Sequence, residues 1–376
     1  MHLRQVSEQL QRLVDKTLER EKYIYSIVLG VAFDDGEFNW SGAAGVADPA
    51  AGSAMQAETP FLIASVTKMY TAAAVMMLQE RGRLQLGDQI GKYLPDGLIQ
   101  GLHHYQGKDY TSQLTIRHLI SQTSGLPDYF LEKPKNGKSV LDRILAEGDR
   151  QWDLDDVVAL TRQEFPARFP PAAFTEGNDG GRTKAHYSDT NYKLLGAIIE
   201  SVTQQPLHAV FEAFFFEPLN LGQTCLYGYA NADSILEPAQ VFYQERPLTI
   251  DRLMRTHGPE GGIVATVDDT LRFGQAFMSG ELFERQDTLE TMQQWNPIFF
   301  PLQYGYGLMR FKVPRLLAPF GYNPELIGHS GSSGSFLYYC RDLNLYLSGT
   351  INQVALRNAP FRLMIKAAQI FKRVSP

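Results

Sequence analysis

Apolar and polar positions follow a few distinct patterns that predict elements near both ends of the chain. Residues 1–22, "MHLRQVSEQLQRLVDKTLEREK", have the periodicity of a charged amphipathic helix. Residues 23–33 and 38–47 are apolar, β-rich runs joined by "DDGE", which predicts a β-hairpin. Residues 334–352, "GSFLYYCRDLNLYLSGTIN", predict two strands about a short turn, and residues 359–374 predict a final amphipathic helix.

The middle of the chain has a different texture. A dense apolar run from Val66 to Leu78 predicts a helix that is buried nearly all round. Beyond it, helical segments alternate with long loops rich in Gly, Pro, Asp and Lys, such as residues 170–186. Residues 115–126 and 191–207 have helical periodicity.

Strands at both ends and helices between them predict an α+β fold. We expect a sheet domain, residues 1–87 together with 237–376, built around an antiparallel sheet that is flanked by helices. A mainly helical domain, residues 88–236, would be inserted into it. The active site would lie in the cleft between the two domains.

Composition narrows the class of protein. The 376 residues are 44% apolar and carry a net charge of −6 without a basic run, so nucleic acid is not an expected partner. No stretch is long and apolar enough for a bilayer and the first helix is too charged for a secretion signal, so a cytoplasmic protein without a membrane partner is expected. Cys225 and Cys340 form no metal motif and the pair His103-His104 is expected in a loop, so no metal site is predicted.

The stretch "GHSGSSGS", residues 328–335, looks like a catalytic serine in a tight turn. It does not spell the G-x-S-x-G nucleophile elbow, in which the histidine follows the serine along the chain. His329 is the last of eight histidines, so none follows these serines. We therefore expect the nucleophile elsewhere, and the hydroxyls of this stretch to be incidental.

Ser65 and Lys68 form an S-x-x-K pair whose side chains share one face of a helix. A serine needs a base, and a lysine withdrawn from water can have its pKa of about 10.4 lowered toward neutrality. The helix N-terminus adds N–H groups where negative charge develops. The alternative is a capping serine with a lysine one turn on, but a lysine on an otherwise buried helix is costly without a purpose.

Two further motifs complete a recognisable order: Tyr187-Ser188-Asp189 and His329-Ser330-Gly331. With S-x-x-K they resemble the penicillin-recognising serine hydrolases, on the branch of class C β-lactamases, D-alanyl-D-alanine carboxypeptidases and family VIII carboxylesterases. "TIRHLISQTSGLPDY", "GPEGGIVATVDDTLRF" and "YGYGLMRF" are also similar to segments of that branch. The resemblance covers roughly Phe61 to Asn352 and implies a β-lactamase/transpeptidase-like fold.

The resemblance also implies roles for the motif residues. Ser65 would be the acylated nucleophile, and Lys68 and Tyr187 would share the general-base and general-acid work. His329 would face the substrate as a cation or a hydrogen-bond donor.

The glycine-rich turn and the strand after it would complete the site. The backbone N–H groups of Ser65 and Ser332 would form the oxyanion hole. Gly331 would allow a close approach of the backbone. Asn352 matches a position that can touch substrate.

Two residues depart from the family pattern. Asp189 stands where the family usually has asparagine; a carboxylate only accepts hydrogen bonds, favours the charged form of Lys68 and repels anionic substrates. It therefore shifts the role of base toward Tyr187. His329 replaces the lysine of β-lactamases, and only its protonated form would bind a carboxylate well.

These residues predict a serine hydrolase that works through an acyl-enzyme without a cofactor, most simply a carboxylesterase for small acyl groups. A D-amino-acid peptidase, a D,D-carboxypeptidase or a weak β-lactamase are alternatives, so the expected partners are small esters, amides or β-lactams. An acyltransferase, or a binding protein that uses the same cleft without catalysis, stays open as well.

Overall fold

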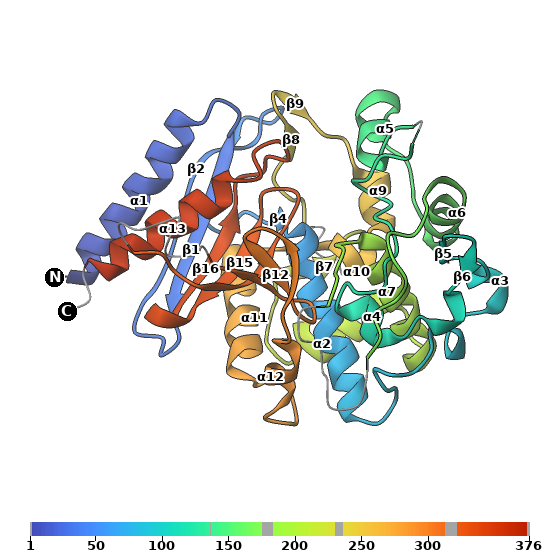
Figure 1. The fold of residues 1–376 in the computed structure, drawn as a ribbon. Coiled ribbons are helices and arrows are strands. Elements are labelled where there is room, and N and C mark those ends of the chain that lie inside the picture. Colours follow the sequence, from blue (N-terminus) through green and yellow to red (C-terminus); the bar gives the residue numbers. More distant parts are fainter. Residues whose placement is uncertain (1, 136, 175–182, 230–235, 313–321, 374–376) are drawn as a thin grey trace.

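Nine antiparallel strands form the central sheet of the computed structural model, which describes residues 2–135, 137–174, 183–229, 236–312 and 322–373. Their order across the sheet is β11-β12-β13-β14-β15-β16-β1-β2-β3 (Figure 1). The strands are β1 Ser26–Phe33, β2 Asn39–Asp48, β3 Ser53–Ala54, β11 Asn296–Phe299, β12 Leu302–Tyr304, β13 Met309–Phe311, β14 Leu326–Ser330, β15 Phe336–Cys340 and β16 Leu345–Thr350.

The two ends of the chain meet in the middle of this sheet. β1 pairs with β2 on one side, which confirms the predicted hairpin, and with β16 on the other, where Val28 lies opposite Thr350. β15 and β16 are the two strands predicted in residues 334–352. The predicted antiparallel sheet built from both termini is therefore confirmed.

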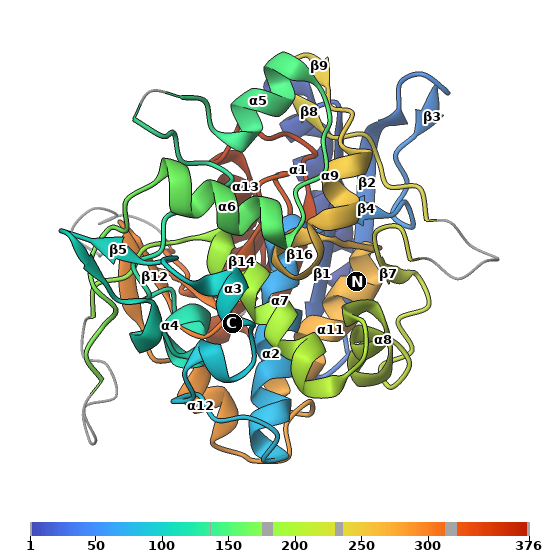
Figure 2. The ribbon, with the colours of Figure 1, turned by 90° about the vertical axis from the view of Figure 1, so that its right-hand side faces the viewer.

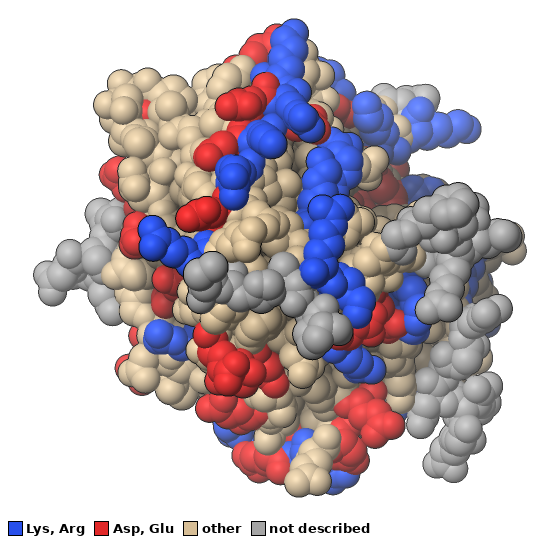
Figure 3. Space-filling model, turned by 90° about the vertical axis from the view of Figure 1, so that its left-hand side faces the viewer, with Lys and Arg blue, Asp and Glu red and all other residues tan. Residues whose placement is uncertain are grey.

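Helices cover both faces of the sheet. α1 (His2–Arg20) and α13 (Ala359–Lys372) pack together on one face, as their amphipathic patterns predicted, and α11 (Val267–Ser279) packs on the other (Figure 1). Gly30 of β1 lets α11 approach closely, because a Cβ there would lie 2.6 Å from the Cγ2 atom of Val267. Figure 3 looks at the side on which α1 and α13 lie, where Lys and Arg side chains gather in bands beside clusters of Asp and Glu.

The helical part of the molecule lies beside the sheet and faces the viewer in Figure 2. α2 is buried from Thr67 to Leu78, as its apolar run predicted. The predicted helix 191–207 is present as α7 up to Thr203, where the left-handed Gln204 ends it, and α8 begins at Leu207. The prediction for residues 115–126 is wrong beyond Ile120, because Gln122 has a left-handed φ of 62° that ends the helix. The helices are α2 Thr67–Glu80, α3 Asp96–Ile99, α4 Ile116–Ile120, α5 Val140–Glu147, α6 Leu154–Glu164, α7 Asp189–Thr203, α8 Leu207–Phe211, α9 Asp251–Thr256, α10 Gly258–Gly261 and α12 Thr288–Met292.

Three small sheets complete the fold. β4 (Phe61–Leu62) and β7 (Thr224–Leu226) both pair with β10 (Ile263–Ala265), and two hairpins are formed by β5 (His104–Tyr105) with β6 (Lys108–Asp109) and by β8 (Phe242–Tyr243) with β9 (Arg246–Pro247). The β4–β10 pairing anchors the segment that leads into Ser65.

The largest cluster of buried apolar side chains runs through both predicted domains. It joins residues of the central sheet, such as Leu29 and Leu347, to residues of α2 and α7, such as Val75 and Ile198. The division at residues 88 and 236 stays a prediction. None of the helices in the described part of the chain is long and apolar enough to cross a membrane.

Candidate active site

Ser65 lies at the start of the long buried helix. It belongs to a short 3-10 turn, Ala64–Val66, that runs directly into α2, and its side chain is nearly buried. Ala64 has a positive φ of 44°, a conformation that costs an alanine on the order of 1 to 3 kcal/mol. The fold around it therefore stabilises a strained backbone directly before the proposed nucleophile.

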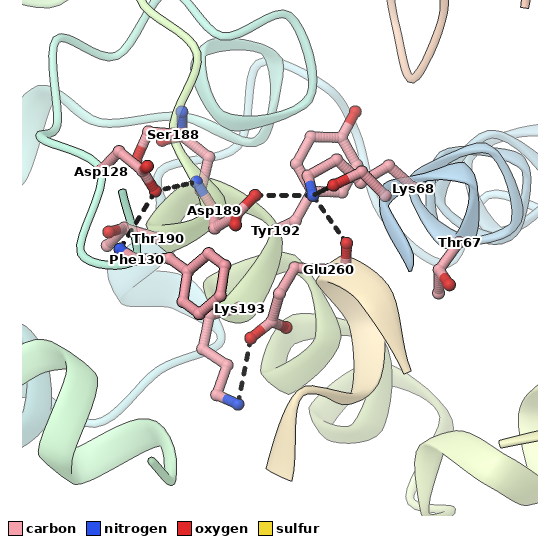
Figure 4. A network of polar contacts seen from close by, with 12 residues as sticks. Thr67, Lys68, Asp128, Phe130, Ser188, Asp189, Thr190, Tyr192, Lys193 and Glu260 are labelled. Atoms are coloured by element: carbon pink, nitrogen blue, oxygen red, sulfur yellow. Dashed lines mark hydrogen bonds and ion pairs between the residues drawn. The ribbon is translucent and has the colours of Figure 1, made fainter. Parts of the chain in front are cut away.

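Lys68 is completely buried and has three acceptors around its ammonium nitrogen (Figure 4). Its Nζ atom lies 3.1 Å from Ser65 Oγ, 2.6 Å from the backbone oxygen of Glu260 and 2.6 Å from Asp189 Oδ1. The first two contacts are hydrogen bonds and the third is an ion pair. The structure thus brings Ser65, Lys68 and Asp189 together in one buried group.

Tyr187 also lies next to Ser65 and Lys68. Its hydroxyl interacts with the Ser65 side chain, and its ring centroid lies 5.2 Å from Lys68 Nζ. Burial, followed by the negative charge of Asp189, raises the pKa of Tyr187 well above the usual value of a phenol. Tyr187 is therefore a neutral phenol at pH 7, with one proton to give and a lone pair to accept another.

Asp189 is the first residue of α7, where a negative charge is favoured by the helix dipole. Its backbone N–H donates to Asp128 Oδ1 over 3.0 Å (Figure 4). Burial and the nearby charge of Asp189 raise the pKa of Asp128 to about 7. The carboxyl groups of Asp128 and Asp189 thus lie close enough to each other for their charges to interact.

Glu260 is a site residue that the sequence analysis missed. Its backbone oxygen accepts from Lys68, and its buried carboxylate lies 3.2 Å from Lys193 Nζ and accepts from the Tyr129 hydroxyl over 2.8 Å. Lys193 and Glu260 therefore form a second buried ion pair, next to the pair of Lys68 and Asp189. The sequence does contain one clue to this residue. Glu260 is a charged residue inside the small-residue stretch "GPEGG", and it is buried in α10.

His329 is buried at the end of β14 and does not act as a cation. Burial, and then the positive charge of Lys68, lowers the pKa of His329 to about 3, so its ring is neutral at pH 7. Its Nδ1 lies 2.8 Å from the backbone oxygen of Ser330, and its Nε2 lies 3.4 Å from the hydroxyl of Tyr304, a second residue that the sequence analysis missed. Of the two roles expected for His329, the hydrogen-bonding one is compatible with this environment.

The glycine-rich turn after β14 packs against the segment that carries the serine. A Cβ on Gly331 would lie 2.7 Å from the backbone oxygen of Ile63, so only glycine permits this approach, as the sequence predicted. Ser333 Oγ donates to the oxygen of Leu62 over 2.9 Å, and Ser335 Oγ donates to that of Ile63 over 2.7 Å. The prediction that these hydroxyls are incidental is therefore wrong, because they fasten the turn.

The oxyanion-hole role of Ser332 stays a prediction, which two observations support. Ser332 and Ala64 line the same narrow cavity, and the Ser332 N–H has no hydrogen-bond partner among the described residues. A free N–H beside the proposed nucleophile is what an oxyanion hole requires.

Asn352 is not brought to this group of residues. It is buried at the end of β16, where its amide nitrogen donates to Ser26 Oγ over 2.9 Å and its amide oxygen lies 3.2 Å from Thr350 Oγ1. Both ends of the side chain are thus occupied within the sheet. The structure contradicts the expectation that Asn352 touches substrate.

The sequence model of the family described as Beta-lactamase matches residues 11–368. The chain belongs to the Beta-lactamase family. Among relatives in this family, Esterase EstB of Burkholderia gladioli is 32% identical over 222 residues, which are 57% of this chain and 50% of that protein. Penicillin-binding protein 4 of Amycolatopsis lactamdurans is 25% identical over 355 residues, 86% of this chain and 79% of that protein.

Solved structures agree with the fold of this family. The D-amino acid amidase from Ochrobactrum anthropi SV3, complexed with L-phenylalanine amide, has a TM-score of 0.75 at 20% identity, over 97% of this chain and 98% of that chain. The hydrolase EstCE1 has a TM-score of 0.75 at 21% identity, over 98% of this chain and 99% of that chain. At these identities the likeness shows the β-lactamase/transpeptidase fold, and the chain is a serine hydrolase of the Beta-lactamase family.

Proposed function

We propose that this chain is a carboxylesterase in which Ser65 forms an acyl-enzyme with small, apolar acyl groups. The observation that carries the proposal is the Ser65 hydroxyl, which accepts a hydrogen bond from Lys68, interacts with Tyr187 and lies next to an apolar cavity. The similarity to Esterase EstB supports an ester as the substrate.

The proton inventory favours Tyr187 as the relay. Lys68 donates to Ser65 Oγ, so the Ser65 proton is free to point to the Tyr187 oxygen. As Ser65 Oγ bonds to the ester carbon, its proton passes to Tyr187 while the proton of Tyr187 passes in the same step to the alcohol oxygen of the ester, so Tyr187 stays neutral. The C–O bond then breaks and the alcohol leaves. Water then repeats the exchange, regenerating Ser65 and releasing the acid.

Electrostatics supports this division of labour. The Lys68 cation stays in place between Ser65 and Asp189, where its positive charge stabilises the developing serine alkoxide. The Ser332 N–H stabilises the oxyanion.

Two observations favour esters over β-lactams. Asp189 places a carboxylate 2.6 Å from Lys68, which leaves less positive charge to attract the carboxylate of a β-lactam. His329 is neutral at pH 7 and adds none. A neutral ester meets neither disadvantage.

The test compares three chromogenic substrates: a p-nitrophenyl ester, a cephalosporin and a D-alanyl p-nitroanilide. We expect the ester to be hydrolysed fastest, with an acyl adduct on Ser65 detected by mass spectrometry. Ser65→Ala is expected to abolish both the ester hydrolysis and the adduct. Ser332→Ala, which keeps the backbone N–H, is expected to retain activity. Ester hydrolysis that survives in Ser65→Ala would overturn the nucleophile assignment. No turnover and no adduct with any substrate would favour a binding protein.

A further inference from the structure

Two neighbouring cavities lie on one side of the proposed nucleophile. The inner one, about 40 Å³, begins at Ala64, Gly261 and Ser332. The outer one, about 600 Å³, lies beyond it and reaches Cys225 and Arg255. No element of the mechanism above uses the outer cavity.

A thin apolar wall separates the two cavities. Five side chains line both of them, and they come from β4, from the β8–β9 region and from the start of α9. These five residues, which we term the partition, are Leu62, Val241, Leu248, Ile250 and Met254. Four of them belong to one small cluster of buried apolar side chains, separate from the main core. The partition is therefore a local structure one side chain thick.

The inner cavity lies on the acyl side of the scissile bond. It begins at Ser332, whose N–H is proposed to hold the carbonyl oxygen, and it does not include Tyr187, which is proposed to protonate the leaving alcohol. The leaving group then departs on the Tyr187 side, and the acyl group points toward the partition. The lining of the inner cavity is largely apolar, with Phe130, Leu141 and Leu253 among its residues.

We propose that the partition sets the length of the acyl group, and that an opening in it admits longer aliphatic acyl chains into the outer cavity. This inference rests on the proposed esterase function. The inner cavity alone has room for roughly two to four carbons, judged against the roughly 10 to 15 Å³ that one water needs on this measure of volume. A longer chain fits only where the partition side chains give way.

The test shortens one partition residue and measures a chain-length profile. Met254→Ala is expected to raise kcat/KM for p-nitrophenyl octanoate about tenfold relative to p-nitrophenyl acetate, because the methionine side chain separates the cavities. Leu248→Ala tests the same wall from another element, should the first variant fold poorly. Leu248→Trp is expected to reduce hydrolysis of the butyrate relative to the acetate.

Val264→Ala is the matched control. Val264 belongs to the same buried apolar cluster as Met254, but it lines only the outer cavity. It is expected to leave the chain-length profile unchanged. If Met254→Ala and Leu248→Ala both keep the wild-type profile while the acetate is hydrolysed, the partition proposal is overturned and the esterase proposal stands. If the wild-type protein hydrolyses no ester and forms no adduct, the esterase proposal itself has failed.

Discussion

Asp189 is the single residue that most changes the chemistry of this site. A carboxylate 2.6 Å from Lys68 Nζ takes the place of the asparagine expected from the family pattern. An amide can donate to a substrate carbonyl, whereas a carboxylate only accepts. The charges of the buried pair therefore interact chiefly with each other, which supports the proposed exchange of protons between Tyr187 and Ser65.

Asp189→Asn is expected to favour anionic substrates. Without the carboxylate, Lys68 exerts more of its positive charge on the substrate, so acylation by a chromogenic cephalosporin should rise about tenfold relative to ester hydrolysis, a change of about 1.4 kcal/mol. The ratio of the two kcat/KM values is the measurement. The surface variant Asp287→Asn, whose carboxylate pairs with exposed Arg285, should leave the ratio unchanged. A constant ratio in Asp189→Asn would refute the charge argument.

Buried histidines predict how stability depends on pH. Burial lowers the pKa values of His257 and His329 to about 3 and that of His118 to about 4. Because these folded values lie below the unfolded value of about 6.5, the unfolded chain binds more protons, and stability is lost as pH falls below 6.5. Asp128, whose folded pKa is raised to about 7, acts in the opposite direction and offsets about one histidine.

These four groups should together lower the free energy of unfolding by roughly 3 kcal/mol between pH 6 and pH 5, at about 1.4 kcal/mol per net histidine. His103 and His186, whose pKa values burial also lowers, add to this fall. Urea unfolding at pH 7, 6 and 5 measures it. His118→Asn should flatten the slope by about one histidine's share. A free energy that does not change between pH 7 and pH 5 would show that these rings gain their protons in the folded state.

At the residue scale, sequence reasoning identified the proposed catalytic residues better than those that surround them. Ser65, Lys68 and Tyr187 share motifs with fixed spacing, and the structure places them in contact. Glu260 and Tyr304 have no such spacing. They reach the site only because α10 and β12 are folded against it, which no local pattern records.

At the scale of elements, the turn after β14 positions the backbone of the proposed oxyanion hole. It presents the Ser332 N–H, and it is fastened to the segment before Ser65 by hydroxyls of the turn itself. Its position depends on the absence of a side chain at Gly331. A small change in this turn should therefore affect catalysis without touching a residue that exchanges protons.

Gly331→Ala is expected to lower kcat/KM for the ester at least a hundredfold. The new Cβ would meet Ser335 Oγ at 2.1 Å and the backbone oxygen of Ile63 at 2.7 Å, so the turn must move away. Overpacking of this kind costs about 1 to 3 kcal/mol of stability. Gly87→Ala, where no atom lies within 4 Å of the new Cβ, is the control and should keep full activity. Equal activities of the two variants would refute the need for close approach.

Long, regular elements were predictable and short ones were not. The apolar alternation of β1 and the periodicity of α7 extend over enough residues to identify them. β4 and β10 have two and three residues, too few for any periodicity, and their pairing joins residues about 200 positions apart. The helix expected after Ile120 was lost to one left-handed residue, Gln122, whose conformation follows from tertiary contacts.

At the scale of the whole molecule, stability depends on the docking of the two ends of the chain. Phe371 of α13 packs edge to face against Phe33 and Phe38, with ring centroids 5.3 Å apart in both pairs. These contacts tie the last helix to the first hairpin. The site lies on other elements, so a change here should alter stability and leave the substrate preference alone.

Phe371→Ala is expected to reduce the free energy of unfolding by about 3 to 5 kcal/mol, as for other buried phenylalanines. Phe300→Ala, at a side chain that is 71% exposed, should change it by less than about 0.5 kcal/mol. Denaturant titration measures both, and KM for the ester should be the same in the two variants. A loss below about 1 kcal/mol in Phe371→Ala would contradict the proposed role of the terminal helices.

The two hydrogen bonds donated by Ser333 and Ser335 also have a consequence for biosynthesis. Each hydroxyl bonds a residue about 270 positions earlier in the chain, directly before Ser65. At 5 to 20 residues per second, a ribosome needs roughly 15 to 50 seconds to travel from one to the other. During that time the nascent chain contains Ser65 but not yet the Ser332 backbone that is proposed to hold an oxyanion. On the proposed role of the Ser332 N–H, the nascent chain and truncated translation products that end before this turn lack a complete oxyanion hole and are inactive.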